Sequence, residues 1–374
     1  MSKLEELIQQ YCPDGVEYKK LGDVCKLARG TRVVKKDLST NGTYPVYQNS
    51  LKPLGYYDQF NRAEETTFII CAGAAGDIGY SKVKFWSADD CFSVICPETI
   101  SNRFIFYCLL SQQNRIYSQV RKASIPRLSH SAVEALHIPV PPLPVQEEIV
   151  RILDALTELQ AELQAELQAE LQARIQQYNY YRDKLLSFND LGGGISVEWK
   201  KLGDVADLGT GSHNTQDGLV EGKYPFYTRG SEILYLNDYD YDETAIITAG
   251  DGAGVGKVFH FVEGKYALHQ RAYRIVPDEK VMLARFVYYY IGATFYNYIM
   301  KSSVSSSVVS IRKPMMVNYP IPVPSLSEQQ RIVDILDRFH ALTTDITAGL
   351  PAEIEARRKQ YEYYRDKLLT FKQK

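Results

Sequence analysis

A glycine-rich segment in the second half of the chain has part of the pattern of a phosphate-binding loop. It reads Gly250-Asp251-Gly252-Ala253-Gly254-Val255-Gly256-Lys257 and follows an apolar run. The spacing G-x-x-x-x-G-K-[ST] is not met, because Asp251 stands at the first glycine position and Val258 follows the lysine. The first half has a related segment, residues 73–79, without a lysine. A tight turn after a strand accounts for both copies.

Other residue types that support catalysis are present but do not form catalytic patterns. An adenine methyltransferase carries an Asn/Asp-Pro-Pro-aromatic motif, and Pro141-Pro142-Leu143 lacks both the leading residue and the aromatic ring. The six histidines are scattered, with no nucleophile–base pattern. The six cysteines lie in the first half, without a C-x-x-C pair or a histidine at metal-ligand spacing, as expected for reduced cytosolic thiols. The sequence therefore predicts no catalytic residue, no metal site and no cofactor bound by this chain.

Polar and basic loops offer a different chemistry, the reading of DNA. Base edges are read by Arg, Lys, Asn, Gln, Ser and Thr side chains, and phosphates are bound by Lys and Arg. In the first half the candidates are Arg29, Thr31, Arg32, Lys35, Lys36, Gln48, Asn49, Ser50, Arg121, Lys122, Ser124 and Arg127. In the second half they are Thr210, Ser212, His213, Asn214, Thr228, Arg229, Lys301, Ser303, Ser305, Ser306, Arg312 and Lys313. For each single residue the alternative is an ordinary solvated side chain, since many surface charges contribute nothing measurable.

The overall charge does not by itself indicate a nucleic-acid-binding protein. The formal net charge is −2 at pH 7. The distribution is uneven: residues 1–144 contain 17 Lys and Arg against 14 Asp and Glu, and the glutamates after Thr157 offset this excess. A local basic face is therefore compatible with a mildly acidic chain.

The strongest pattern in the sequence is internal repetition. Five segments recur in the same order: Val16–Val24 as Val197–Val205, Tyr44–Tyr47 as Tyr224–Tyr227, Ile69–Gly73 as Ile246–Gly250, Ile138–Pro141 as Ile321–Pro324, and Tyr180–Leu186 as Tyr363–Leu369. The period is about half the chain, which indicates a duplicated unit and not a solenoid. The candidate DNA-binding loops differ between the halves while these flanking motifs repeat, as two different half-targets would require.

Each half combines two kinds of structure. The first is a globular region of short β-type runs broken by Gly and Pro, with helical segments such as Asn102–Val120 and Lys280–Met300. The second is a long helix after the Ile-Pro-Val-Pro segment, where proline ends the preceding structure. These helices are expected from about Val145 to Phe188 and from about Ser327 to Phe371. Gly349-Leu350-Pro351 is expected to kink or interrupt the second helix.

The two helical segments have equal expected lengths, because the offset between the halves is 183 residues at both their starts and their ends. Equal lengths suit two antiparallel helices related by a pseudo-twofold axis. The predicted fold class is α+β, with two pseudo-repeated β-rich domains separated by two long antiparallel coiled-coil helices. The expected divisions are 1–144 and 189–326 for the domains, and 145–188 and 327–374 for the helices.

A tetrapeptide repeat occupies the first long helix. Leu-Gln-Ala-Glu starts at Leu159, Leu163 and Leu167 and closes as Leu-Gln-Ala-Arg at Leu171, and all these residue types favour helix. Each four-residue step advances by about 400°, so the leucine stripe drifts by about 40° per repeat. The repeat is either a strut alone or a strut that also presents leucines to helices of another protein, and its length can change in whole units. The candidate coiled-coil and partner-binding residues are these four leucines with Ile332, Ile335 and Leu336.

In combination these motifs resemble the specificity subunit of type I restriction–modification systems. The resemblance rests on the two Pro-rich exits, the helix starts Ser327–Asp337 and Pro144–Asp154, and the shared ending Tyr-Tyr-Arg-Asp-Lys-Leu-Leu. The first helix start departs slightly, with Glu148 where the second has Arg331. The match covers essentially the whole chain, and the Leu-Gln-Ala-Glu repeat resembles the subgroup with Thr-Ala-Glu-Leu repeats at this place.

The resemblance implies a non-catalytic subunit that reads a bipartite double-stranded DNA target within a complex for phage defence. Its partners would be two methyltransferase subunits, which carry S-adenosylmethionine and methylate adenine, and restriction/translocase subunits that use ATP and Mg. The alternative is a stand-alone, dimer-like DNA-binding protein without catalytic partners, which leaves the drifting leucine surface unexplained. A pure coiled-coil scaffold leaves the divergent basic loops unexplained, and a restriction enzyme with its own nuclease lacks the necessary motifs.

The sequence also predicts where the protein resides. The first ten residues, MSKLEELIQQ, form a polar amphipathic start and not a signal peptide. No stretch reaches the roughly 18 apolar residues of a membrane span. The expected location is therefore the cytoplasm.

Overall fold

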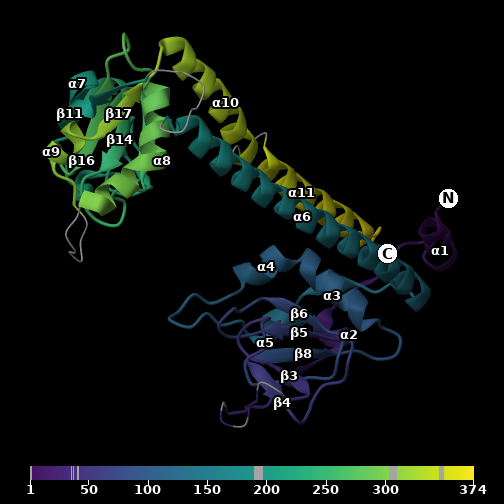
Figure 1. The fold of residues 1–374 in the computed structure, drawn as a ribbon. Coiled ribbons are helices and arrows are strands. Elements are labelled where there is room, and N and C mark those ends of the chain that lie inside the picture. Colours follow the sequence, from purple (N-terminus) through teal and green to yellow (C-terminus); the bar gives the residue numbers. More distant parts are fainter. Residues whose placement is uncertain are drawn as a thin grey trace. The chain divides into compact units, whose positions relative to one another are not determined.

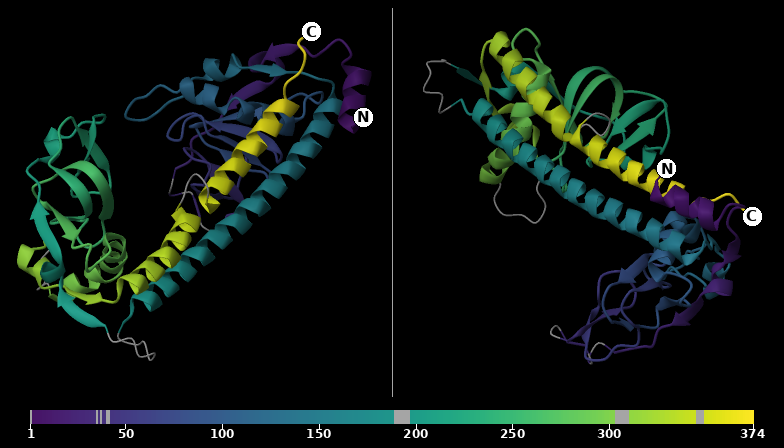
Figure 2. Two further views of the ribbon diagram at one scale, coloured as in Figure 1. Left: turned by 90° about the horizontal axis from the view of Figure 1, so that it is seen from above. Right: turned by 90° about the vertical axis from the view of Figure 1, so that its right-hand side faces the viewer.

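The computed structural model describes residues 2–34, 36, 38–39, 42–188, 197–302, 310–344 and 349–374. It contains two compact units: Met1–Leu167 with Ile354–Lys374, and Gln168–Glu353. Each unit combines a β-rich domain with segments of long helix (Figures 1 and 2). The predicted α+β class with two β-rich domains and long helices is confirmed.

The first unit is built around a four-stranded sheet of order β2-β8-β5-β6. A three-stranded sheet, β4-β3-β7, and a two-stranded sheet, β1-β9, accompany it. The elements are α1 (Lys3–Tyr11), β1 (Tyr18–Lys20), α2 (Leu21–Val24), β2 (Lys26–Arg29), β3 (Tyr44–Tyr47), β4 (Gly55–Tyr57), β5 (Thr66–Ile70), β6 (Ile78–Ser81), β7 (Trp86–Ser87), β8 (Cys91–Ile95), α3 (Asn102–Ser111), α4 (Gln113–Ser118), α5 (His130–Glu134), β9 (His137–Pro139) and the start of α6 (Leu143–Leu186).

The second unit has a six-stranded sheet of order β11-β16-β14-β15-β12-β13 and a separate pair, β10-β17. Its elements, after the end of α6, are β10 (Glu198–Lys201), α7 (Leu202–Val205), β11 (Ala206–Thr210), η2 (Thr215–Asp217), β12 (Tyr224–Tyr227), β13 (Ile233–Leu236), β14 (Tyr241–Ala249), β15 (Phe259–Leu268), β16 (Ala272–Pro277), α8 (Ala284–Ser302), α9 (Lys313–Val317), β17 (Pro320–Val323) and α10 (Leu326–Thr344). The last helix, α11 (Leu350–Leu368), begins in this unit and continues in the first.

Two of the repeated sequence motifs are paired strands in both units. In the first, β1 and β9 pair antiparallel with Tyr18 opposite Pro139. In the second, β10 and β17 pair in the same way, with Trp199 opposite Pro322. The buried residues Ile138 and Ile321 anchor the pairs to their cores. The repetition of these motifs thus reflects one structural frame that is built twice.

A third repeated motif is displaced by two residues in the structure. The sequence aligns Ile70 with Ile247, but Ile70 pairs with Cys91 on β8 whereas Ala249 pairs with the equivalent residue Ala272 on β16. Ile70 is therefore equivalent to Ala249. A shift of two residues keeps every side chain on the same face of the strand, so the apolar pattern alone could not reveal it.

The long helices pair antiparallel within each unit. In the first, the Thr157 hydroxyl on α6 lies 2.8 Å from the Tyr361 hydroxyl on α11, and Leu369 joins the core that contains Ile149 and Leu153. In the second, Tyr181 of α6 stacks on Phe339 of α10, and Leu186 packs in the core with Ile332. The predicted interruption of the second long helix is confirmed, because Gly349 is not helical and α11 begins at Leu350.

The departure at Glu148 has a structural reason. The Glu148 carboxylate is buried and binds Lys3 of α1 at 2.8 Å and Arg151 at 2.7 Å. Hydrogen bonds from Arg151 and Lys3 lower the pKa of Glu148 to about 2. The residue at this point of the second helix, Arg331, instead pairs with Glu328 one turn earlier. Glu148 therefore holds the N-terminal helix, and the two chain ends lie close together (Figures 1 and 2).

A buried glutamine ties each long helix to its β-rich domain. The Gln146 amide donates to the Pro141 and Thr99 carbonyls at 2.7 and 3.2 Å and accepts from the Ser101 N–H at 2.9 Å. The Gln329 amide makes the equivalent bonds, to the Pro324 and Val281 carbonyls at 2.8 and 3.0 Å and from the Leu283 N–H at 2.8 Å. Both side chains are fully buried, so each bond satisfies a group that water cannot reach.

We predict that Gln329→Ala destabilises the second unit by about 2–4 kcal/mol, because one buried carbonyl, one partly buried carbonyl and one partly buried N–H lose their partner. The neighbouring Gln330→Ala is the control, since the Gln330 side chain is exposed and donates to Asp334 on the same helix. Urea denaturation should give a lower midpoint for Gln329→Ala and an unchanged midpoint for Gln330→Ala. Equal midpoints for the two variants would show that the buried amide does not hold the helix.

Candidate DNA interface

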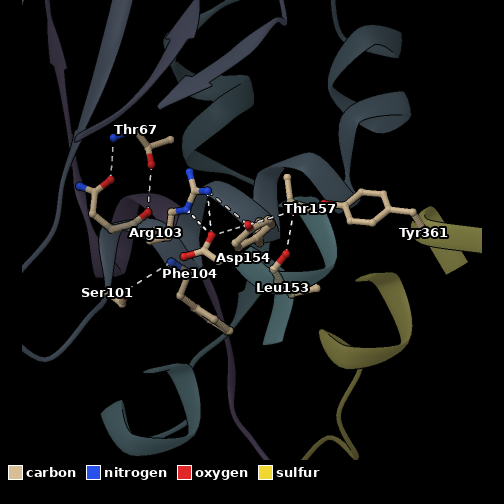
Figure 3. Close-up of polar contacts among 10 residues, drawn as sticks. Thr67, Ser101, Arg103, Phe104, Leu153, Asp154, Thr157 and Tyr361 are labelled. Atoms are coloured by element: carbon tan, nitrogen blue, oxygen red, sulfur yellow. Dashed lines mark hydrogen bonds and ion pairs between the residues drawn. The ribbon is translucent and has the colours of Figure 1, made fainter. Parts of the chain in front are cut away.

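In the first unit, an ion pair between α3 and α6 attaches the β-rich domain to the long helix. Arg103 of α3 binds Asp154 of α6 at 2.7 Å, and the Tyr107 hydroxyl donates to the same carboxylate at 2.5 Å. Figure 3 shows Arg103, Asp154, Thr157 and Tyr361 in one chain of polar contacts from the domain to α11. Burial and the bond to Asp154 raise the pKa of Tyr107, so the hydroxyl stays protonated and donates.

The second domain repeats this attachment. Arg285 of α8 binds Asp337 of α10 at 2.9 Å, and the Tyr289 hydroxyl donates to the same carboxylate. Each arginine also lies over aromatic rings of its own domain. The pairs are partly shielded from water, which strengthens them relative to exposed ion pairs. Both domains are thus held on their helices in the same way, which fixes the direction in which their loops face.

Three segments of the first domain meet where β5 ends. The Cys71 N–H donates to the Asp90 carbonyl at 2.7 Å, and the Leu128 N–H donates to the Cys71 carbonyl at 2.9 Å. Arg127 forms a bridge with Ala72. The Arg29 guanidinium, at the end of β2, donates to the Asp89 carbonyl at 3.1 Å. Exposed Arg29 and Arg127 therefore lie at one edge of the four-stranded sheet.

The Gln48–Ser50 loop reaches the same edge. The Ala74 N–H donates to the Asn49 carbonyl at 2.9 Å, and the Gly73 N–H donates to the Pro126 carbonyl at 3.3 Å. The exposed side chain of Asn49 thus stands beside the strand end and the Arg127 segment. We call the set Arg29, Asn49, Asp89, Asp90 and Arg127 the first-domain edge.

The other candidates of the first domain lie on its surface, some of them in the loops that contain Asn49 and Arg127. Thr31, Arg32, Lys36, Arg121, Lys122 and Ser124 are exposed, and Gln48 and Ser50 are half-buried. The Arg121 and Arg127 backbones bond each other at 2.8 and 3.2 Å, so residues 121–127 form a closed loop. Ser50 caps the Lys52 carbonyl at 2.9 Å. Lys35 lies outside the described residues.

An arginine–aspartate–arginine cluster marks the corresponding place in the second domain. The Asp251 carboxylate accepts from Arg229 at 2.9 Å and from Arg271 at 3.1 Å. Burial of Asp251 acts to raise its pKa, but the hydrogen bonds and charges of the two arginines outweigh this and lower the pKa. The cluster borders a hollow of about 200 Å³ lined by Thr210, Gly250, Asp251, Gln270, Arg271, Tyr273, Ser310 and Ile311. We call Thr210, Arg229, Asp251, Gln270, Arg271 and Ser310 the second-domain edge.

The remaining candidates of the second domain lie around this hollow or further away. Asn214 accepts from the Gln270 amide, and the His213 carbonyl accepts from the Gln270 N–H at 2.9 Å. Ser212 bonds Asp240 at 3.0 Å, and Thr228 accepts from the Gly230 N–H at 3.4 Å. Exposed Arg312 and Lys313 follow Ile311 at the start of α9, and Lys301 is exposed on α8. Ser303, Ser305 and Ser306 lie outside the described residues.

Sequence reasoning missed four members of the second-domain edge: Asp251, Gln270, Arg271 and Ser310. In the sequence Asp251 is notable only as the residue that breaks a glycine motif. Gln270-Arg271 follow an apolar run, and no Gly, Pro or Asn there indicates a loop. The internal repeat held the signal: the 181-residue offset between Val24 and Val205 places Gln270-Arg271 opposite Asp89-Asp90. A change from two acids to an amide and a cation within a repeat points to a position under different functional demands.

The leucines of the tetrapeptide repeat are unequally buried. Leu159 is 60% exposed, Leu163 and Leu171 are half-buried, and Leu167 is buried. This agrees with the expected drift of the stripe around the helix. Ile332 and Leu336 are buried in the core of the second unit. Ile335 lines an apolar groove of about 480 Å³ with Tyr181, Leu185 and Phe339.

Within the described ranges, no group of three or more His, Cys, Asp and Glu side chains could hold a metal ion. None of the helices in the described part of the chain is long and apolar enough to cross a membrane.

The duplicated β-rich domains on paired helices, each with a polar edge and basic loops, are suited to reading DNA. The type I restriction modification DNA specificity domain matches residues 13–173 and again residues 196–356, so the chain belongs to this family. The protein is therefore a DNA specificity subunit of a type I restriction system, and the family match makes it a non-catalytic subunit.

Curated relatives and solved structures agree with this assignment. The chain is 32% identical to the EcoR124I/EcoR124II specificity subunit of Escherichia coli, over 99% of this chain and 97% of that protein. It is 33% identical to a putative type I specificity subunit of Haemophilus influenzae, over 95% and 96%. One solved structure was determined to explain complex assembly and conformational transition of the type I restriction–modification system. A chain of that structure is 19% identical to this protein, with a TM-score of 0.68, and the match covers 96% of this chain and 98% of that one. At that identity the likeness shows the fold alone.

We predict that Arg127→Ala weakens DNA binding by the assembled complex. If Arg127 contacts a phosphate, affinity falls for all sequences and the salt slope of log K drops by about one. If it contacts a base, discrimination at one position falls by roughly 1–3 kcal/mol. Lys26→Ala is the control, because exposed Lys26 lies at the opposite end of β2 from Arg29. Salt-dependent binding assays distinguish these outcomes, and equal affinity of the two variants would remove Arg127 from the interface.

Proposed function

We propose that this subunit reads a bipartite double-stranded DNA target, with one half-target for each β-rich domain, and that it scaffolds the enzymes that act there. The domains are assigned to residues 1–144 and 189–326, and the helical segments to 145–188 and 327–374. The observation that carries this proposal is that the two domain edges share a backbone but differ in side chains.

The shared backbone is evident in equivalent hydrogen bonds. The Cys71 N–H donates to the Asp90 carbonyl at 2.7 Å, and the Gly250 N–H donates to the Arg271 carbonyl at 2.8 Å. A Cβ on Gly30 or on its equivalent Gly211 would fall 1.9 or 1.8 Å from a carbonyl oxygen, so both positions require glycine. On this common backbone Arg29 corresponds to Thr210, Asn49 to Arg229, Ala72 to Asp251, Asp90 to Arg271, and Arg127 to Ser310.

Such a pattern suits two readers of different sequences. Every one of these pairs changes its hydrogen-bonding character. The backbone bonds at the strand end recur, because the Leu128 N–H donates to the Cys71 carbonyl and the Ile311 N–H donates to the Gly250 carbonyl. A scaffold without a DNA target would have no reason to vary these positions while it keeps their backbone, and base readout depends on the donors and acceptors that they present.

A second repeated surface supports two copies of one partner. In Tyr-Tyr-Arg-Asp-Lys-Leu-Leu the first tyrosine is 62% exposed as Tyr180 and 61% exposed as Tyr363. In both copies the arginine binds the following aspartate, at 2.7 Å for Arg182 and 2.8 Å for Arg365. Exposed aromatic residues that repeat in sequence and conformation are suited to bind identical partners.

We assign these partners as two methyltransferase subunits that carry S-adenosylmethionine and methylate adenine. Restriction/translocase subunits that use ATP and Mg would add to the same complex, in the cytoplasm. The apolar groove at Tyr181, Leu185, Ile335 and Phe339 includes a tyrosine of the first pair, Tyr180-Tyr181, and offers a surface for an apolar helix face of a partner. A stand-alone DNA-binding protein would not need either surface.

Exchange of one domain tests the division of labour. Replacement of residues 1–144 by the corresponding domain of a relative should change one half of the methylated sequence and leave the other half, because each edge is held within its own domain. The readout is genome-wide mapping of methylated adenines in cells that also carry the methyltransferase partner. The unchanged half is the internal control. A simultaneous change of both halves, or methyl transfer by the purified chain alone, would contradict the proposal.

The tetrapeptide repeat is proposed to set the distance between the half-targets. The repeat lies within the continuous helix α6, so a change in repeat number alters helix length without a new loop. One unit is four residues, or about 6 Å of helix. It also rotates the helix by about 40°, and one DNA base pair turns the duplex by roughly 34–36°.

Deletion of Leu163–Glu166 should therefore keep both half-target sequences and shorten the spacer between them by one base pair. Translation alone would allow one or two base pairs at about 3.4 Å each, and the rotation favours one. Assembly with the partner should persist, because the neighbouring units present the same leucine surface. Mapping of methylated adenines in cells with the deletion gives the spacer directly. An unchanged spacer with full activity would mean that the repeat serves packing only.

A further inference from the structure

Arg271 of the second-domain edge is unusually well fixed for an exposed side chain. Its guanidinium is 63% exposed and donates from Nη1 to Asp251 at 3.1 Å. Its backbone N–H donates to His269 Nδ1 at 2.9 Å, and its carbonyl accepts from the Gly250 N–H at 2.8 Å. Burial lowers the pKa of His269, so the ring remains neutral and Nδ1 stays an acceptor. A long side chain that is held at both ends loses less conformational entropy when it binds a ligand.

The carboxylate of Asp251 beside Arg271 weakens the attraction of this arginine for an anion. Asp251 is shared with Arg229, at 2.9 Å, and its lowered pKa keeps it ionised near neutral pH. A DNA phosphate at Arg271 would approach this carboxylate, and like charges repel. A base edge carries no net charge and avoids that repulsion. The cluster is therefore better suited to base reading than to phosphate binding.

The donors that remain on Arg271 match one base edge in particular. Within the described residues the guanidinium of Arg271 bonds Asp251 through Nη1, and its Nε and Nη2 remain available to a ligand. Two parallel N–H donors fit the O6 and N7 acceptors of guanine in the major groove, which is the commonest specific arginine contact. Thymine and cytosine do not offer two adjacent acceptors there, and adenine offers one acceptor beside a donor.

The neighbouring side chain belongs to the same surface. Gln270 is exposed, and its Nε2 donates to Asn214, which leaves its Oε1 directed to no protein donor in the described part of the chain. The first domain has Asp89 and Asp90 at the equivalent positions. These acids accept hydrogen bonds where Arg271 donates them. The two edges therefore differ most in polarity at this point.

We propose that Arg271 is a specificity-determining residue that reads a guanine in the half-target of the second domain, with Asp251 as its positioning residue. The inference rests on the proposed function, since it requires that this domain read a half-target. It adds the residue, the base and the groove.

The test compares four complexes, each assembled from the full chain and its methyltransferase partner. The chain is wild type, Arg271→Ala, Asp251→Asn or Lys280→Ala. Lys280 is exposed in the same domain, so its variant removes one positive charge without a change at the edge. Methylated adenines are mapped genome-wide, and methylation rates are measured on duplexes that differ at single positions of the half-target. The half-target of the first domain serves as the internal control.

Arg271→Ala should make one G·C position of the second-domain half-target degenerate, with a loss of roughly 10- to 100-fold in discrimination there. Asp251→Asn should relax the same position to a smaller degree, a result that a purely structural role would not give. Lys280→Ala and the first-domain half-target should remain unchanged. A folding defect would not account for this result, because it would lower methylation of every sequence and would not relax a single position. Arg271 is also exposed, so its removal leaves the core unchanged.

Three results would overturn the inference. The methylated sequence of Arg271→Ala could equal that of the wild type, or its binding could fall equally for all sequences with a smaller salt slope, as for a phosphate contact. The relaxed position could also be an A·T pair, which would refute the guanine assignment. A wild-type complex without any bipartite target would instead show that the proposed function itself is wrong, and this inference with it.

Discussion

The proline-rich exits from the two β-rich domains impose the constraint on which the rest of the structure depends. Proline supplies no N–H, and the exits leave the Pro141 and Pro324 carbonyls buried where each helix begins. A single amide side chain resolves this in each half, because Gln146 and Gln329 both donate to these carbonyls and accept from a backbone N–H of the domain. Separation of the domain from the helix would therefore leave these carbonyls and the glutamine amide without hydrogen-bond partners, which costs free energy.

The attachment is reinforced by a second layer that is also built twice. Arg103 with Asp154, and Arg285 with Asp337, join the first helix after each sheet to the long helix. These contacts repeat because the two halves must solve the same mechanical problem. The domain edges differ because they face different chemistry. The chain thus separates what must stay constant, the placement of the edge, from what must vary, the side chains on it.

Much of the fold was accessible from the sequence, since its signals are local or repeated. The expected helix Val145–Phe188 is α6, Leu143–Leu186, and the glycine–proline break before α11 was correctly placed. The β-strand register was not accessible: the repeated Ile-Ile-x-Ala-Gly pattern is displaced by two residues, which an apolar alternation of period two cannot detect.

The candidate edges were only partly predictable for a related reason. Four edge residues could be predicted because they lie in loops whose polar composition is evident from the sequence: Arg29, Asn49, Arg127 and Arg229. Asp251 and Arg271 lie 20 residues apart in the sequence. The pairing of β14 with β16 brings them together, and only then can they form an ion pair. Their cooperation is a property of the sheet and not of either segment.

The glycines that follow β2 and β11 carry a consequence for how such a protein changes over time. Because Gly30 and Gly211 and the nearby backbone bonds place the edges, an exposed side chain such as Arg271 can be replaced at little cost in stability. A population can therefore explore new target sequences by single substitutions, while every intermediate remains folded and able to assemble. Selection on recognition is in this way uncoupled from selection on folding, and new specificities can arise without a passage through unstable ancestors.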